Sequence, residues 1–184
     1  FVGRLTFEKG VDLVMHAAFW LLAEYPKVQV FIVGPIGDEV GQHVSTRLQL
    51  GTQVASIRER MFVATTFYPV TSDMRYGCDL CLCPSRVEPF GYVDIEFAWH
   101  GTLTVGALVG GLGKVPGVYY RVQEHGDQLH MLQQFKQAIL RALSMTSEER
   151  LECGRAGLNV GFPYAAWSAA LEDQYSLTLA AADE

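Results

Sequence analysis

Short apolar segments alternate with helix-like segments along most of this 184-residue chain, and this alternation restricts its fold more than any other feature. Brief runs rich in β-branched residues and bounded by Gly or Pro predict strands, whereas apolar residues repeating every three or four positions predict helices. The expected strands are 1–2 (the tail of a strand), 28–33, 61–67, 80–83, 103–105 and 118–122. The expected helices are 11–25, 38–60 with a break near residue 51, 72–76, 90–100, 127–143, 147–158 and 164–180.

This order of segments predicts an α/β fold with a Rossmann-like, mostly parallel sheet that carries helices on both faces. Ligands of such open sheets bind beyond the carboxyl ends of the strands. Four turns rich in glycine or charged residues follow expected strands, at residues 3–10, 34–41, 84–91 and 106–117. A functional site is therefore expected where these turns meet.

The composition is typical of a globular domain and excludes several classes of protein. Hydrophobic residues make up 49% and charged residues 18% of the chain, which argues against disorder. The formal net charge is −6 and the basic residues form no cluster, so nucleic acid is not an expected partner. No apolar run is long enough to cross a membrane. Three of the four cysteines lie within residues 78–83 and are interpreted as core residues, because no second ligand pair completes a zinc site. No metal site is expected.

The turn that reads PSRVEPFG follows a strand and leads into a helix. Phe90, Gly91 and Tyr92 would present unpaired backbone N–H groups to an anion such as a phosphate at the positive end of that helix. Glu88 lies in the same turn and Glu96 lies further along the helix. A carboxylate beside a phosphate site must contact something other than the phosphate, and sugar hydroxyls would suit both glutamates.

Two further turns offer complementary groups. Arg4 and Lys9 flank the first turn, where a guanidinium fork and a mobile ammonium could both bind phosphate. The turn at 106–117 holds five glycines but matches neither the P-loop nor the GxGxxG pattern. Local spacing leaves simpler alternatives open. Glu88 would then pair with Arg86 or cap a turn, Glu96 would be an exposed helix residue, and the two cations of the first turn would be solvated.

Considered together, three motifs resemble the C-terminal half of glycogen and starch synthases, which are retaining glucosyltransferases of the GT-B fold. They are GRLTFEKG at 3–10, PSRVEPFG at 84–91, and the Gly110-Gly111-Leu112 triplet. The spacing of Glu88 and Glu96 is similar to the paired glutamates of retaining GT-B enzymes more widely. The stretch 88–120 is most similar to the synthase domain of cell-wall α-1,3-glucan synthases. Phe90 in place of a frequent Cys, and the missing Asp-Thr after Gly113, favour that branch.

The resemblance implies a nucleotide-sugar donor-binding domain at 1–163, followed by a C-terminal helix at 164–184 that packs back on an N-terminal domain absent from this fragment. Glu88, Arg4 and Lys9 would be the catalytic residues. By the same resemblance, Arg4 and Lys9 would hold the donor diphosphate, Glu88 would contact the glucose and Glu96 would bind the ribose hydroxyls. The phosphates would face Phe90, Gly91 and Tyr92, and the donor would be approached by the backbone N–H groups of Gly110, Gly111 and Leu112. The nucleobase would lie near Gly34–Gly37 and Phe67–Tyr68.

The same resemblance implies transfer of glucose from UDP-glucose or ADP-glucose to a growing α-glucan, with no metal or other cofactor. We expect the isolated 184 residues to be inactive without the N-terminal domain. The parent protein is expected to act on the cytoplasmic side, with any membrane attachment outside these residues. Two alternatives stay open: another retaining GT-B glycosyltransferase with a different sugar or acceptor, and a non-catalytic sugar-nucleotide-binding module. The sequence does not fix the glucan linkage or the nucleotide.

Overall fold

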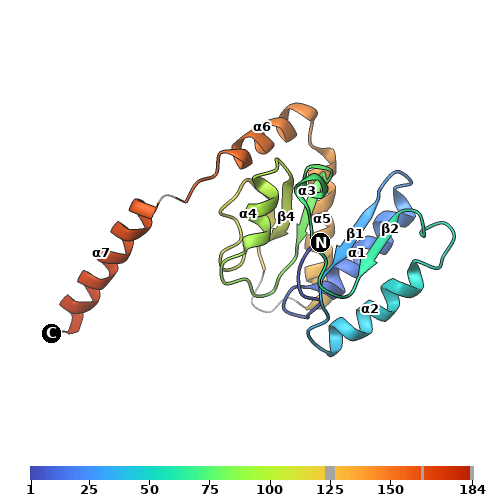
Figure 1. The fold of residues 1–184 in the computed structure, drawn as a ribbon, viewed down its shortest axis with the longest axis horizontal. Coiled ribbons are helices and arrows are strands. Elements are labelled where there is room, and N and C mark those ends of the chain that lie inside the picture. Colours follow the sequence, from blue (N-terminus) through green and yellow to red (C-terminus); the bar gives the residue numbers. More distant parts are fainter. Residues whose placement is uncertain (123–126, 163, 183–184) are drawn as a thin grey trace.

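The computed structural model describes residues 1–122, 127–162 and 164–182, and its strands and helices follow the expected order (Figure 1). The elements are α1 (Val11–Glu24), β1 (Val30–Val33), α2 (Glu39–Gly51), β2 (Met61–Ala64), α3 (Ser72–Tyr76), β3 (Leu80–Cys83), α4 (Tyr92–Ala98), β4 (Leu103–Ala107), β5 (Gly117–Tyr120), α5 (Gln128–Ser144), α6 (Ser147–Leu158) and α7 (Tyr164–Ala182).

Three elements are clearly shorter than expected, and glycine accounts for two of these differences. The helix expected at 38–60 ends at Gly51, and turns follow it. The helix expected at 90–100 is shorter, because Gly91 and Gly101 adopt the left-handed conformation on either side of α4. The strand expected at 61–67 ends at Ala64, where its pairing with β1 also ends.

All strand pairs in the described residues are parallel, as expected, but they form two sheets instead of one. β1 pairs with β2, and β4 lies between β3 and β5. The first residues of the chain run beside β1 through single bridges, Val2 to Val33 and Leu5 to Ile36. The backbone hydrogen bonds described for residues 1–5 go to the β1 side, so this segment extends the smaller sheet without joining it to β3.

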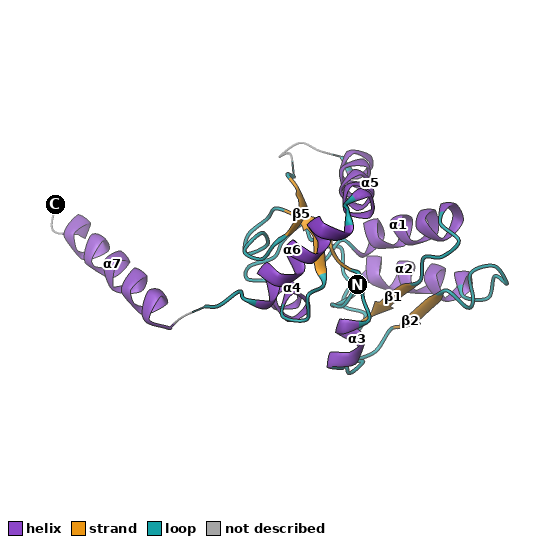
Figure 2. Ribbon diagram, turned by 90° about the horizontal axis from the view of Figure 1, so that it is seen from above, coloured by secondary structure: helices purple, strands orange, loops and turns teal. Residues whose placement is uncertain are grey.

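Helix α1 lies next to α5 and α2 (Figure 2), and its side chains contribute to the cores of both sheets. One side of α1, including Leu13 and Leu21, shares a core with β3, β4, β5 and α5. The other side, including Val14 and Leu22, shares a second core with β1 and α2. A helix that is apolar on nearly all sides is expected to be buried, which explains the dense apolar sequence VDLVMHAAFWLL.

The expected helix layers are confirmed for the three-stranded sheet. Side chains alternate along a strand, so Leu82 faces the α5 side whereas Cys81 and Cys83 face Phe97 of α4. The smaller sheet differs. Its Val30 and Ile32 pack on α1 and α2. On its opposite face, the ring of Phe31 stacks on that of Phe62 with centroids 5.2 Å apart.

The last helix, α7, extends away from the other elements in both views (Figures 1 and 2). A helix in this part of the chain is thus confirmed, over Tyr164–Ala182. Its packing on another domain stays a prediction. Within the described ranges, no helix combines the length and the apolar character that crossing a membrane requires.

Candidate functional site

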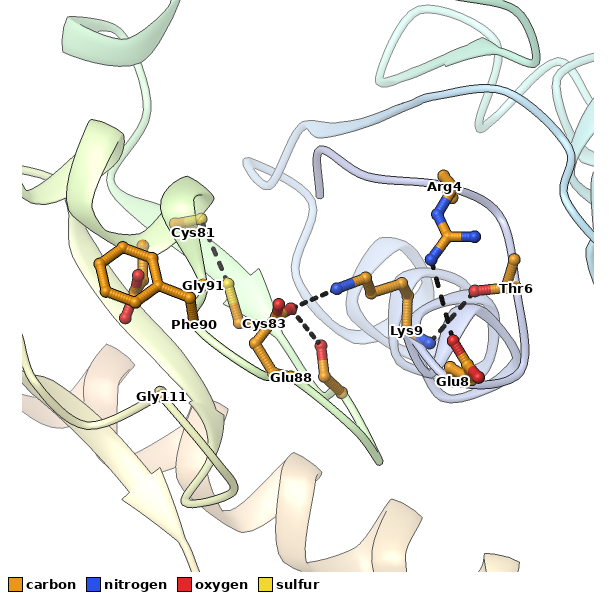
Figure 3. A network of polar contacts seen from close by, with 12 residues as sticks. Arg4, Thr6, Glu8, Lys9, Cys81, Cys83, Glu88, Phe90, Gly91 and Gly111 are labelled. Atoms are coloured by element: carbon orange, nitrogen blue, oxygen red, sulfur yellow. Dashed lines mark hydrogen bonds and ion pairs between the residues drawn. The ribbon is translucent and has the colours of Figure 1, made fainter. Parts of the chain in front are cut away.

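The turns at 3–10 and 84–91 meet beyond the carboxyl ends of the strands, where an ion pair joins them (Figure 3). The Lys9 Nζ lies 2.5 Å from the Glu88 Oε2, although the two residues are 79 positions apart in the sequence. Their side chains are only 19% and 15% exposed. Ser85 Oγ lies 3.4 Å from the same carboxylate oxygen and donates to it. Lys9 is therefore not a solvated loop cation, and that alternative is wrong for this residue.

The close approach of these two turns depends on backbone contacts. Gly10 precedes α1 with φ of 70°, and a Cβ at this position would lie 2.2 Å from the carbonyl oxygen of Pro84. A side chain is thus excluded both by conformation and by space. The N–H of Arg86 donates to the carbonyl of Glu8 at 2.7 Å. The backbone itself therefore brings Lys9 to Glu88.

A second ion pair, which the sequence analysis missed, supports the same junction. Arg86, the alternative partner of Glu88, instead donates to both carboxylate oxygens of Asp12 at 2.8 Å. It also donates to the carbonyl of Phe7, and its guanidinium lies 3.8 Å from the centroid of the Phe7 ring. Gln128 of α5 donates to Asp12 at 2.7 Å. Burial raises the pKa of Asp12, but the hydrogen bonds and charge of Arg86 outweigh it, so the pKa is lowered overall.

Arg4 is less constrained than Lys9. Its side chain is 60% exposed and points toward Glu8 of the same turn, with the closest nitrogen and oxygen 3.8 Å apart (Figure 3). An exposed pair of this kind contributes little to stability, so the guanidinium is free of a strong internal partner. Its contact with a diphosphate stays a prediction.

The turn at 106–117 packs backbone to backbone against the turn at 84–91. A Cβ on Gly110 would lie 2.1 Å from the carbonyl oxygen of Glu88, and one on Gly111 would lie 2.1 Å from that of Phe90. The N–H of Gly111 donates to Glu88 at 2.8 Å, and that of Leu112 donates to Val109. These two N–H groups are therefore engaged within the protein, and a direct role for them toward a donor stays a prediction.

Glu96 has a partner on a neighbouring helix. Arg75 of α3 donates to its Oε2 at 3.0 Å and to the carbonyl of Val70 at 2.8 Å. Glu96 is therefore not simply an exposed helix residue, although its carboxylate is still partly accessible. Phe90 and Tyr92 are exposed and their ring centroids lie 4.8 Å apart, whereas Gly91 is buried. Binding of ribose by Glu96 and of phosphate at Phe90, Gly91 and Tyr92 stays a prediction.

The residues suggested for the nucleobase divide into two groups. Gly34 and Gly37 allow the first turn to approach, because a Cβ on either would collide with Gly3 or Thr6. Phe67 is exposed, whereas Tyr68 packs edge-on against Phe31 and Phe62. A groove of about 670 Å³ lies at the opposite, amino ends of β1 and β3, and none of the expected site residues lines it.

The cysteines are core residues, as interpreted from the sequence. Cys81 and Cys83 are buried with their sulfur atoms 3.7 Å apart, in a core with Phe97 and Leu112. The hydrogen bond with the neighbouring Cys81 thiol, together with burial, raises the pKa of Cys83. No cluster of three or more potential metal ligands occurs within residues 1–122, 127–162 and 164–182.

The fold and this junction define an α/β domain whose charged turns converge at the carboxyl ends of parallel strands, which is the usual position of nucleotide sites in open sheets. The family model described as "Glycosyl transferases group 1" matches residues 1–159. The chain belongs to this family.

Similar proteins extend this result. A cell wall alpha-1,3-glucan synthase of Schizosaccharomyces pombe is 39% identical over 172 residues, which is 94% of this chain and 7% of that protein. Glycogen synthase 2 of Nitrosococcus oceani is 35% identical over 118 residues, covering 61% of this chain and 21% of that protein. The catalytic domain of starch synthase IV of Arabidopsis thaliana, solved with ADP and acarbose, superposes with a TM-score of 0.72 at 18% identity, over 97% of this chain and 38% of that structure. The fold is that of GT-B glycosyltransferases. The chain spans a small part of the relatives' length.

Proposed function

We propose that this domain binds the nucleotide-sugar donor of a retaining glucosyltransferase that extends an α-glucan. Membership of the glycosyltransferase family and the likeness to a cell wall alpha-1,3-glucan synthase support the reaction class and the acceptor. The observation that carries the proposal is the partly buried Lys9–Glu88 pair at the junction of the two turns. UDP-glucose and ADP-glucose are the candidate donors.

The chemistry of glycosyl transfer assigns different tasks to the two members of this pair. As the bond between glucose and the diphosphate breaks, positive charge develops on the sugar and negative charge on the departing oxygen. Lys9 and the exposed Arg4 supply positive charge beside that oxygen, a form of stabilisation that contributes about 3 to 4 kcal/mol per well-placed donor in other enzymes. Glu88 faces the sugar, and Glu96 accepts from the ribose. No metal takes part in this proposal.

The structure adds one condition to donor binding. Lys9 and Glu88 pair with each other, so a donor diphosphate would compete with Glu88 for the ammonium. Once the ammonium turns toward the phosphates, the Glu88 carboxylate becomes available to a glucose hydroxyl. The pair thus holds both groups ready without leaving either charge buried alone.

Donor turnover by the full-length protein tests this proposal. We expect glucose transfer from one of the two nucleotides, and we expect Glu88→Gln to lower kcat by roughly 100-fold or more, because it removes the charge and keeps the shape. Glu24→Gln, an exposed glutamate at the end of α1, is the matched control and should behave as wild type.

Three results would count against the proposal in different ways. Turnover of a different sugar nucleotide with none of the glucose donors would favour another retaining glycosyltransferase. Unchanged turnover in Glu88→Gln would favour a non-catalytic binding module. Polymer synthesis by the 184 residues alone would contradict the dependence on an N-terminal domain, which we propose as the partner that binds the acceptor.

We further propose that the full-length protein acts on the cytoplasmic side of a membrane, which protease protection in sealed vesicles would test.

A further inference from the structure

Lys114 joins three segments of the chain around one ammonium group. Its Nζ lies 2.5 Å from the carbonyl oxygen of Phe90 and 2.7 Å from those of Gly91 and Gly111. The carboxylate oxygens of Asp94 lie 2.8 Å and 3.1 Å away. The ammonium therefore connects the end of the turn at 84–91, the first turn of α4 and the turn at 106–117.

These contacts leave the ammonium no capacity for a ligand. A lysine ammonium has three N–H donors, and five oxygen atoms already surround this one within hydrogen-bonding distance. Its side chain is 18% exposed and that of Asp94 is fully buried. The position of Lys114 therefore suits a structural role, whereas Lys9 lies where it can contact a substrate.

The carbonyls that Lys114 holds belong to the segments next to Glu88. Phe90 and Gly91 follow Glu88 in the same turn, and Gly111 donates its N–H to the Glu88 carbonyl at 2.8 Å. Leu112 and Val115 anchor the other side of the turn in two buried clusters. A displacement of this turn would therefore move the backbone of Glu88.

Asp94 is the counter-ion of the Lys114 ammonium, so the contacts around Lys114 depend on both charges. Its carboxylate also accepts from the N–H of Ile95 at 2.8 Å, and it lies inside the protein. Without Lys114 this carboxylate would be a buried charge with no counter-ion, which destabilises proteins strongly. Without both charges, the three carbonyls would lose their common donor, and only the backbone contacts between the two turns would remain.

We propose that Lys114, with Asp94 as its counter-ion, is a positioning residue that fixes the backbone of Glu88 by fastening the turn at 106–117 to the start of α4. This inference rests on the proposed function for its effect on catalysis. Its effect on the turn itself does not depend on that function, so the two can be tested separately.

The experiment compares four full-length proteins: wild type, Lys114→Met, the double variant Lys114→Met with Asp94→Asn, and Lys27→Met as a matched control at an exposed lysine. Two kinds of measurement are made: the kinetic constants kcat and KM for the glucose donor, and the hydrogen-exchange rate of the Gly111 amide. We expect Lys114→Met to lower kcat/KM by about 10- to 100-fold, because small displacements of reacting groups have effects of this size. The Gly111 amide should exchange faster in both Lys114 variants.

The double variant separates positioning from general stability. Removing both charges should restore much of the stability that Lys114→Met loses, because no charge then stays buried alone. We expect kcat/KM to stay low nevertheless. Wild-type kcat/KM in the double variant, or unchanged exchange at Gly111, would overturn the inference. Absence of donor turnover in wild type would instead contradict the proposed function, and the exchange rates would still decide whether Lys114 holds the turn.

Discussion

Two ion pairs at the junction of the turns at 3–10 and 84–91 differ in geometry and in burial. Lys9 and Glu88 form a single short contact and are partly accessible, so a ligand can separate them. Asp12 and Arg86 form a two-pronged contact that Gln128 completes from α5. Bidentate pairs of arginine and carboxylate are both stronger and more directional. The second pair therefore fixes the geometry in which the first pair works.

The Asp12–Arg86 pair predicts a specific dependence of stability on pH. The pKa of Asp12 is lowered in the folded protein, so this group contributes stability above about pH 4, its ordinary range, and loses it as the pH falls through the lower value. We expect Asp12→Asn to reduce the free energy of unfolding by about 3 kcal/mol at pH 7. The difference in the free energy of unfolding between Asp12→Asn and wild type should become smaller below pH 4.

Urea denaturation of the two proteins at pH 7, 5 and 3 measures this effect. Asp73→Asn, which changes an exposed aspartate of α3, is the control and should stay within about 0.5 kcal/mol of wild type. A constant difference between Asp12→Asn and wild type at all three pH values would show that the carboxylate charge is not the cause.

At the residue scale, the sequence indicated the charged residues of the candidate site but not the residues that support them, Asp12 and Lys114. Glu88, Lys9 and Arg4 were expected because polar groups after strands indicate a site. Asp12 did leave a signal, as a single acid within the apolar run VDLVM. Lys114 left none, because its partners Phe90 and Asp94 lie 20 or more positions away and three of its five acceptors are backbone carbonyls, which sequence does not distinguish.

Among the elements, the turn at 106–117 owes its shape to contacts that only glycine permits. Gly111 is pressed against the Phe90 backbone, where a Cβ would meet three backbone atoms within 2.6 Å. We expect Gly111→Ala to lower the free energy of unfolding by about 2 kcal/mol, because backbone atoms cannot yield as a side chain can. Gly161→Ala is the matched control, since a Cβ there meets nothing within 4 Å. Thermal unfolding of both variants gives the comparison, and equal losses would contradict this explanation.

The elements were predictable in kind and order, but their ends and their grouping into sheets were not. Hydrophobic periodicity, short β-branched runs and turn residues together located all twelve helices and strands of the described residues. The length of α2 was misjudged because the polar residues after Gly51 suit turns as well as a helix. The separation into two sheets depends on which strand edges hydrogen-bond, and periodicity carries no information about edges.

For the molecule as a whole, α1 couples the two sheets, because its side chains belong to both hydrophobic cores. Leu13 belongs to the core of the larger sheet and Val14 to that of the smaller one, and both are fully buried. We therefore expect the two sheets to unfold in one cooperative transition. Leu13→Ala should lower the midpoint measured by far-UV circular dichroism and by tryptophan fluorescence equally, with a loss of about 3 kcal/mol. Two separated transitions in either variant, Leu13→Ala or Val14→Ala, would show that the sheets are independent units.

The position of α1 also makes the distance between Lys9 and Glu88 informative about internal motion. Lys9 lies just before α1, which among the described helices contributes to both cores, whereas Glu88 follows a strand of the larger sheet. A shift of α1 relative to the larger sheet would change the separation of these two side chains. The distance between a pair of spectroscopic labels near them would therefore report internal motion, and it would show whether binding of a donor at the junction changes the relative position of the two sheets.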